Sequence, residues 1–207
     1  MKEQELIERY QAGERDFSQA DLELADLSTA NLSGVNLRGA NLRHSNLRDV
    51  DLSGADLREA NLRGADLRNA NLIEARLSGA NLCLADLQLA DMSGADLSGV
   101  DLRGAEMNRA TARMVNLFQA NLHRTDLSGA DLRKSDLREA RLRQSKFYMV
   151  NLWLADLSGA DLRGSDLSGA DLLKANFSGA TVTEVQLAQA RSFEGATLPD
   201  GTKHKTV

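Results

Sequence analysis

The sequence predicts an all-β solenoid of short extended segments, and three observations support this class. An apolar residue, large at every site but Ala112, recurs at every fifth position from Phe17 to Leu187. Neither a helix nor a continuous strand places such a period on one face. Of the 16 glycines, 13 lie two residues after this large residue. The single proline, Pro199, follows the repeats. The chain must therefore turn once in every pentapeptide.

Two positions of each pentapeptide are predicted to face the interior. The large position occurs 35 times and is Leu in 28 of them. From Leu22 onward, the position two residues earlier occurs 34 times and is Ala in 23. Neither position carries a charge, although 27% of the chain is charged. Since residues two apart in an extended segment share a face, each segment directs one small and one large side chain inward.

The remaining positions of the repeat have the chemistry of a turn. Glycine adopts positive φ with little strain, as one residue of a type II turn requires. Asp or Asn stands just before most of the large residues, and these side chains readily bond to nearby backbone in turns. Proline is absent because most amides are needed for pairing between coils. The position two after the large residue is therefore the predicted corner.

The stretch 55–72, "ADLREANLRGADLRNANL", shows the motif A-[DN]-L-x-x, and residues 16–190 repeat it without interruption. This pattern resembles the pentapeptide repeat family. The resemblance implies a right-handed quadrilateral β-helix with four pentapeptides, or about 20 residues, in each coil. The residues themselves do not decide this number. Arg76 has an aspartate 20 residues away on either side, but with Arg141 included a 15-residue coil fits the charges equally well.

Both ends depart from the repeat. Residues 1–15 are predicted to form a cap with a short helix, because Leu6, Ile7 and Tyr10 share one helical face and Gly13 follows. The opening stretch also resembles the N-terminus of a cyanobacterial member of the family that is associated with heterocyst regulation. The register slips by one residue after Ala190.

The C-terminal segment, residues 191–207, is predicted to form a second cap and a tail. It contains the turn "PDG" and ends in the basic stretch "TKHKTV". The repeats between the two caps, residues 16–190, form the single predicted domain.

Composition and spacing argue against an enzyme, a cofactor and a membrane segment. The 207-residue chain has a net charge of −5, no long apolar run and one cysteine, which favours a cytoplasmic protein. Cys83 and His123 would share a face but lie two coils, ~10 Å, apart, too far to bind one metal ion. The aspartates are interpreted as turn formers, and a regular rod offers no cleft for a substrate.

One face of a 20-residue coil is predicted to be basic. It consists of residues 20–24 and those displaced from them by multiples of 20, and is called the basic face below. Its net charge is +2, whereas the other three faces have net charges of −3, −1 and −3. Equivalent arginines form a basic stripe along it: Arg43, Arg63, Arg103, Arg143 and Arg163. The stripe is either a binding site for an anionic partner or ordinary solvent-exposed surface, where arginine is common.

A second candidate surface is apolar. Two consecutive repeats and one further position carry large apolar residues in slots where other repeats mostly have Ser, Arg, Gly or Glu: Tyr148, Met149, Trp153, Leu154 and Leu173. Exposed aromatic clusters are typical of interfaces. This patch is interpreted as an interface with a protein partner or a second copy, so that the chain is a monomer or a weak homodimer. The alternative is packing between neighbouring corners.

One repeat is irregular in its core. Residues 111–115, "TARMV", place Ala112 where the other repeats have a large residue. Met92 is one coil away, and Met107 and Met114 are close in sequence. Because methionine fills irregular gaps, we expect a soft, methionine-lined part of the core here.

The predicted function is a non-enzymatic, rod-like interaction or scaffold protein, with regulation as its candidate role. Its partner is an unidentified protein, and direct binding of nucleic acid is not expected. The family resemblance implies an alternative, since some members mimic duplex DNA, engage DNA gyrase and give quinolone resistance. Such a mimic would be acidic on its engaging side and would commonly carry an interrupting loop and a C-terminal dimerisation element. This chain has a basic face and no insertion between Phe17 and Leu187.

Overall fold

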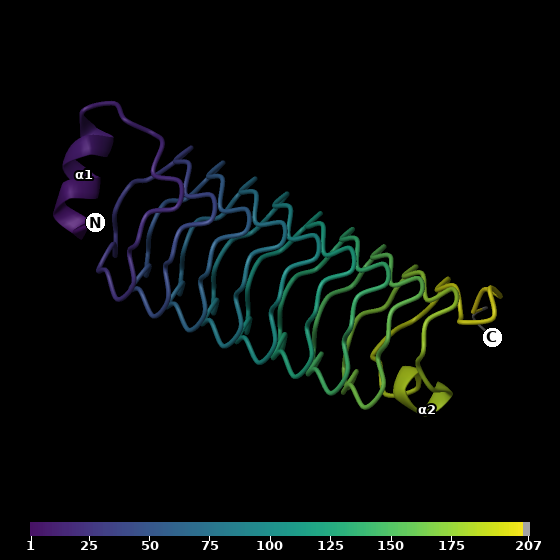
Figure 1. Ribbon diagram of the computed structural model, residues 1–207. Helices are drawn as coiled ribbons and strands as arrows, with labels where there is room; N and C mark the ends of the chain where they lie inside the picture. The colour runs from purple at the N-terminus through teal and green to yellow at the C-terminus, as the bar shows by residue number, and fades with distance from the viewer. Residues whose placement is uncertain (205–207) are drawn as a thin grey trace.

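The computed structural model describes residues 1–204 and shows a straight rod of stacked coils (Figure 1). Helix α1, Glu3–Gln11, lies at the N-terminal end of the rod. Helix α2, Glu184–Leu187, lies near the other end, beside the last coils. Between the two helices the chain winds continuously, so that each coil rests on the one before it.

Each coil contains 20 residues and has four sides. Parallel β-bridges join residues 20 apart, as in the series Asp56, Arg76 and Asp96, and this spacing holds from Asp16 to Thr181. The 20-residue coil is therefore confirmed, and a 15-residue coil is excluded. Neighbouring coils pair through isolated bridges, one at each face, so the coils stack without forming long strands.

The four faces follow from this spacing. The first face comprises residues 16–19, then residues 35–39 and the residues displaced from these by multiples of 20. The basic face, which starts with residues 20–24, is the second. The third face starts with residues 25–29 and the fourth with residues 30–34.

All five backbone N–H groups of the repeat at residues 51–55 have an acceptor. The N–H groups of Leu52 and Gly54 donate to the following coil at 2.8 and 2.9 Å, and that of Asp51 donates to the preceding coil at 2.9 Å. Ala55 closes the turn by donating to the carbonyl oxygen of Leu52 at 3.0 Å. The N–H of Ser53 donates to Oδ1 of Asp51 at 3.0 Å. Proline is excluded because it would leave an acceptor unpaired.

The corner residue has positive φ in every repeat from Gln19 to Gly179, and this confirms the predicted corner position. Glycine, however, supplies only 13 of these corners, and 20 are other residues. Leu24, for example, has a φ of 62°, and its N–H donates to the next coil at 2.9 Å. The corner amide must face the following coil, and this pairing imposes a backbone conformation that the side chain disfavours.

The interior is filled as the sequence predicts. The large and small positions from Leu32 to Ala180 are buried, and even the bulky Phe147 and Phe177 are fully enclosed. The prediction was wrong for Val185, which is 73% exposed because the chain there forms α2 and not a further side of a coil. Where the small residue is polar, its hydroxyl finds a backbone acceptor: Thr125 donates to the carbonyl oxygen of Leu102 at 2.7 Å. Buried polar groups of this kind are tolerated because they are hydrogen-bonded.

The predicted methionine-lined core is only partly present. Met92 and Met107 are buried beside Ala112, but Met114 is 62% exposed. The prediction for Met114 was wrong because this residue occupies the corner position, which has a φ of 54° and points its side chain to solvent.

Helix α1 lies over the first coil, in the segment where the sequence predicts a helix. The side chain of Leu6 is fully buried against the core. The ammonium of Met1 donates to the carbonyl oxygen of Asp21 at 2.8 Å, and Oε2 of Glu3 accepts the N–H of Asp26 at 3.2 Å. These contacts replace hydrogen bonds that a preceding coil would otherwise supply.

The other end is closed by α2 and a short hairpin. Thr183 and Gln186 form a capping box at the start of α2, and Nε2 of Gln186 donates to the carbonyl oxygen of Leu162 at 2.8 Å. Beyond α2 the bridge spacing becomes 21 residues, as between Asp171 and Ser192, in agreement with the predicted slip of one residue. Of the predicted basic tail, Lys205 to Val207 lie outside the described residues.

Candidate functional site

Three adjoining depressions run along the basic face. Their volumes are about 540, 410 and 380 Å³. They share lining residues, with Arg103 between the first two, Arg143 between the last two, and His123 in all three. Arg63 and Arg163 line the outer two. The structure therefore joins four members of the basic stripe in one shallow groove, called the basic groove below.

Several arginines on the other faces pair with an aspartate of their own repeat. The guanidinium of Arg138 pairs with Asp136, two residues earlier, at 2.7 Å, and Arg58 pairs with Asp56 in the same way. The side-chain hydrogen bond from Arg138 lowers the pKa of Asp136. The aspartate that forms the turn thus also binds the arginine that follows the large residue.

Most arginines of the basic stripe are also paired. Arg103 pairs with Asp101 at 2.6 Å, and its side-chain hydrogen bond lowers the pKa of that carboxyl. Two arginines share one carboxylate: Nε of Arg143 lies 2.5 Å, and a terminal nitrogen of Arg163 2.7 Å, from Oδ2 of Asp161.

The stripe's other two arginines lack a carboxylate in their own repeat. Arg43 lies 3.6 Å from a carboxylate oxygen of Glu23 in the preceding coil. Arg63 has no ion pair and no side-chain hydrogen bond within residues 1–204. The groove consequently retains positive charge that the protein itself does not neutralise.

Cys83 and His123 line the same depression, as their shared face predicts. Within the described residues, no three His, Cys, Asp or Glu side chains are grouped so that they could hold a metal ion.

The predicted apolar patch is divided between two corners. Tyr148 and Met149, exposed to 51% and 60%, form the corner between the third and fourth faces. Trp153 and Leu154 form the next corner, and Leu154 is 40% exposed. The ring of Trp153 is half-buried beneath the side chain of Lys134, whose Nζ lies 5.3 Å from the ring centroid.

Trp153 also lines a depression of about 190 Å³ together with Met114. The fifth residue of the predicted patch, Leu173, is half-buried one coil beyond Trp153. Other exposed apolar corners were not predicted as site residues, including Leu24 and Leu84 on the basic face. Their corner position is the sequence feature that could have identified them.

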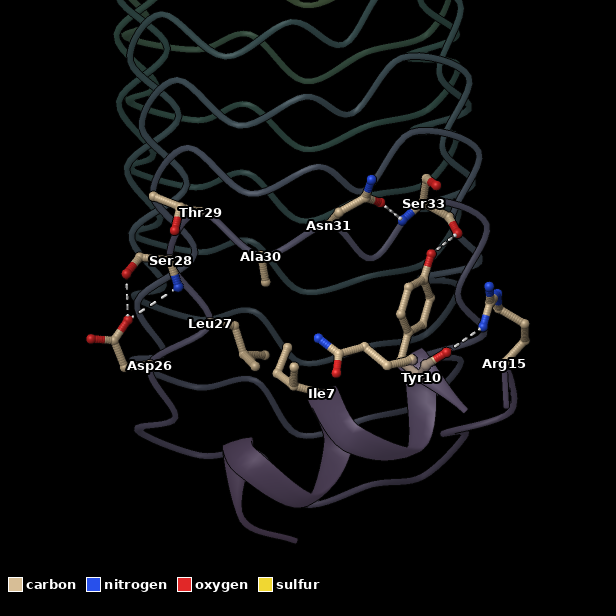
Figure 2. A pocket seen from close by; sticks show the side chains of 11 residues that line it. Ile7, Tyr10, Arg15, Asp26, Leu27, Ser28, Thr29, Ala30, Asn31 and Ser33 are labelled. Atoms are coloured by element: carbon tan, nitrogen blue, oxygen red, sulfur yellow. Dashed lines mark hydrogen bonds between the residues drawn. The ribbon is translucent and has the colours of Figure 1, made fainter. Parts of the chain in front are cut away.

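A further depression of about 660 Å³ lies between α1 and the first coils (Figure 2). Ile7 and Leu27 point toward each other in it, and the hydroxyl of Tyr10 donates to the carbonyl oxygen of Ser33 at 2.8 Å. Its acidic side chain, Asp26, accepts hydrogen bonds from Ser28, which lower the pKa of the carboxyl. The side chains that line this depression therefore stabilise the contact between α1 and the first coils.

No helix within residues 1–204 has the length and apolar character needed to cross a membrane. Comparison with curated protein sequences gives no match.

Solved structures with similar folds include the following two. HetL, a pentapeptide repeat protein involved in heterocyst differentiation regulation from the cyanobacterium Nostoc sp. strain PCC 7120, is 33% identical over 99% of this chain and 100% of HetL, with a TM-score of 0.71. A trypsin-treated form of QnrB1, a plasmid-mediated fluoroquinolone resistance protein, is 23% identical over 77% of this chain and 82% of its own, with a TM-score of 0.62. The second likeness shows the fold alone.

The family comparison agrees with the coil geometry. The profile for pentapeptide repeats matches residues 16–49, 51–88, 85–124, 116–153 and 155–191. Proteins of this family fold as right-handed quadrilateral β-helices and are generally non-enzymatic structural or interaction proteins. The chain belongs to the pentapeptide repeat family.

Proposed function

We propose that this protein is a rigid interaction module that acts in the cytoplasm and presents its outer faces to a protein partner in a regulatory assembly. The observation that carries the proposal is the exposure of Tyr148 and Met149 on a rod whose core is already complete. The full-length similarity to HetL, which is involved in heterocyst differentiation regulation, supports a regulatory role.

Physical reasoning supports a binding role for these side chains. Tyr148 and Met149 are more than half exposed at their corner, so they present apolar surface to water. Tyr and Trp are over-represented among the residues that contribute most to protein–protein binding. The closed backbone of each coil keeps the two corners at a fixed distance, so the surface needs little ordering when a partner binds.

Affinity purification from the host organism tests this function. We expect the wild-type protein to recover a specific partner. The amount of partner recovered by the double variant Tyr148→Ala, Trp153→Ala should be lower by a factor of about ten or more. The matched control is Leu24→Ala, Leu89→Ala, which removes exposed apolar side chains from other corners. Recovery of equal amounts of partner by all three proteins would show that the interface lies outside the apolar patch. The absence of any specific partner would contradict the proposed function.

The alternative is a DNA-mimicking protein that binds DNA gyrase. The net charge of −5 and the three acidic faces favour it, and the fold shared with QnrB1 is compatible with it. The basic groove and the uninterrupted coils from residue 16 to residue 181 favour the interaction module. A gyrase supercoiling assay separates the two, because a mimic at micromolar concentration would change the activity or its quinolone sensitivity.

A further inference from the structure

We propose that the basic groove binds an extended acidic peptide segment of a protein partner, with the peptide carboxylates between Arg63 and Arg143. This inference rests on the proposed function and names the chemistry of the partner.

The choice of Asn over Asp on this face is the first argument. Oδ1 of Asn61 accepts the N–H of Arg63 at 3.3 Å, and Oδ1 of Asp56 on the first face accepts the N–H of Arg58 at 3.2 Å. Both residues therefore form the same turn, and the fold is served equally by either. Asp56, however, also binds the guanidinium of Arg58, whereas the amide of Asn61 leaves Arg63 unpaired.

The same choice recurs along the groove. The residue before the large position is Asn at positions 41, 61, 81 and 121 of the basic face, with Asp101 the only acid within that run of positions. The Nδ2 groups of Asn61, Asn81 and Asn121 donate to no acceptor within residues 1–204. Asn81 and Asn121 line the groove.

Arginines without a carboxylate partner lie among these asparagine amides. Arg141 lines the groove and has no carboxylate partner among the described residues, and Arg124 is bound only by the neutral amide of Gln144, at 2.9 Å. Guanidinium and amide N–H groups together match the acceptor oxygens of carboxylates, and charged hydrogen bonds of this kind are the stronger ones.

The dimensions fit a peptide in the extended conformation. Arg63 and Arg143 are four coils apart, or ~19 Å at the ~4.8 Å spacing of paired strands. An extended chain advances ~3.4 Å per residue, so about six residues cover this distance. Acidic residues at alternate positions would all face the groove, since alternate side chains share one side of an extended chain.

Nucleic acid fits this face less well. Single strands are bound by aromatic side chains that stack on bases, and the basic face contains no Phe, Tyr or Trp. The other three faces are acidic overall and would repel a phosphate backbone that extends beyond the groove.

Binding of a labelled peptide of about eight residues, with alternating Glu and Ser, tests the inference by fluorescence anisotropy at ~0.05 M salt. The test variant is Asn61→Asp, Asn121→Asp, which retains both turns and places one carboxylate beside Arg63 and another beside Arg141. The matched control is Arg48→Ala, Arg109→Ala on the third face, where neither arginine has an ion pair within residues 1–204. Both variants lower the net charge equally, and thermal unfolding checks that each is folded.

We expect the wild type and the control to bind the peptide alike, the test variant to bind at least about tenfold more weakly, and added salt to weaken binding. A peptide with Gln in place of Glu should not bind. No binding by wild type, or equal loss in both variants, would overturn the inference, as would equal or tighter binding of a single-stranded oligothymidylate. If the purified host partner is recovered equally by the Asn61→Asp, Asn121→Asp variant, the proposed function stands and this inference fails.

Discussion

At the scale of single residues, the corners show how coil pairing determines backbone conformation. Thr29 has a φ of 59°, although a β-branched side chain is strongly disfavoured there. Its N–H donates to the carbonyl oxygen of Arg48 in the next coil at 2.8 Å. Asn69 occupies the equivalent corner two coils further on with a φ of 56°, and asparagine tolerates this conformation better.

We therefore predict that Thr29→Gly stabilises the protein by about 0.5–1 kcal/mol, because glycine removes the strain and keeps the amide. Asn69→Gly is the matched control, and we expect it to change the free energy of unfolding by less than about 0.5 kcal/mol. Urea unfolding followed by circular dichroism measures both. A destabilised Thr29→Gly variant would show that the corner is not strained by its side chain.

At the scale of elements, α1 closes an end that would otherwise expose the core and unpaired backbone. Leu6 provides its buried contact, and the hydroxyl of Tyr10 provides a hydrogen bond to the first coil. Solenoids are stabilised by contacts between neighbouring units, so the terminal unit needs a substitute for its missing neighbour. Helix α2 provides the equivalent at the other end through Gln186.

For this cap we predict that Leu6→Ala lowers the free energy of unfolding by about 2–4 kcal/mol, since it leaves a cavity under the helix. Amide exchange should accelerate first in the coil that starts at residue 16, because that coil loses its cover. Gln4→Ala, at an exposed position of the same helix, should stay within about 0.5 kcal/mol of wild type. Equal changes in the free energy of unfolding for the two substitutions would contradict a capping role for α1.

At the scale of the whole molecule, repetition multiplies small electrostatic effects. Burial raises the pKa of Asp131, but hydrogen bonds from Arg133 and Arg113 outweigh it and bring the pKa to about 2. Burial likewise raises the pKa of Asp126, and bonds from Ser128 and Lys146 bring it to about 2. Hydrogen bonds also lower the pKa of other repeat aspartates: Asp16, Asp26, Asp56, Asp66, Asp101, Asp136, Asp166 and Asp171.

The sign of the resulting pH dependence follows from linkage. An unfolded aspartate has a pKa of about 3.9, so between this value and the lower folded pKa the unfolded chain binds more protons. These carboxylates contribute their full stability above about pH 4 and lose it as the pH falls toward about 2. We expect the urea midpoint to fall steeply across that window. A midpoint that is unchanged down to pH 2 would contradict the contribution of these carboxylates.

Asp131→Asn is the variant that checks the assignment. Its side-chain oxygen can still accept the N–H of Arg133, as Oδ1 of Asp131 does at 3.3 Å, but the titrating group is gone. The variant should be less stable at neutral pH and lose less stability between about pH 4 and about pH 2 than wild type. An acid-unfolding profile parallel to that of wild type would show that Asp131 does not contribute.

The basic groove and the apolar patch exist only at this largest scale. The sequence identified Arg63 and Arg143 as equivalent positions, but it could not show which arginines lack a carboxylate, because some partners come from a neighbouring coil, as Glu23 does for Arg43 and Asp161 for Arg143. It grouped Tyr148 with Trp153 as one patch, whereas the structure places them on successive corners. The side chain of Trp153 is half-covered by Lys134, which precedes it by one coil.

The sequence by itself determined one turn in every pentapeptide and the identity of the inward residues. Both are local properties, because Leu27 and Ala25 share a side of the same short segment whatever the rest of the chain does. Only the tertiary structure decided that four segments close a coil, since closure depends on the sum of corner angles and on which residues pair between coils. The tertiary structure also decided the positive φ of Leu24. The N–H of Leu24 must donate to the next coil, and the free energy of leaving this buried donor unpaired exceeds the strain of a positive φ.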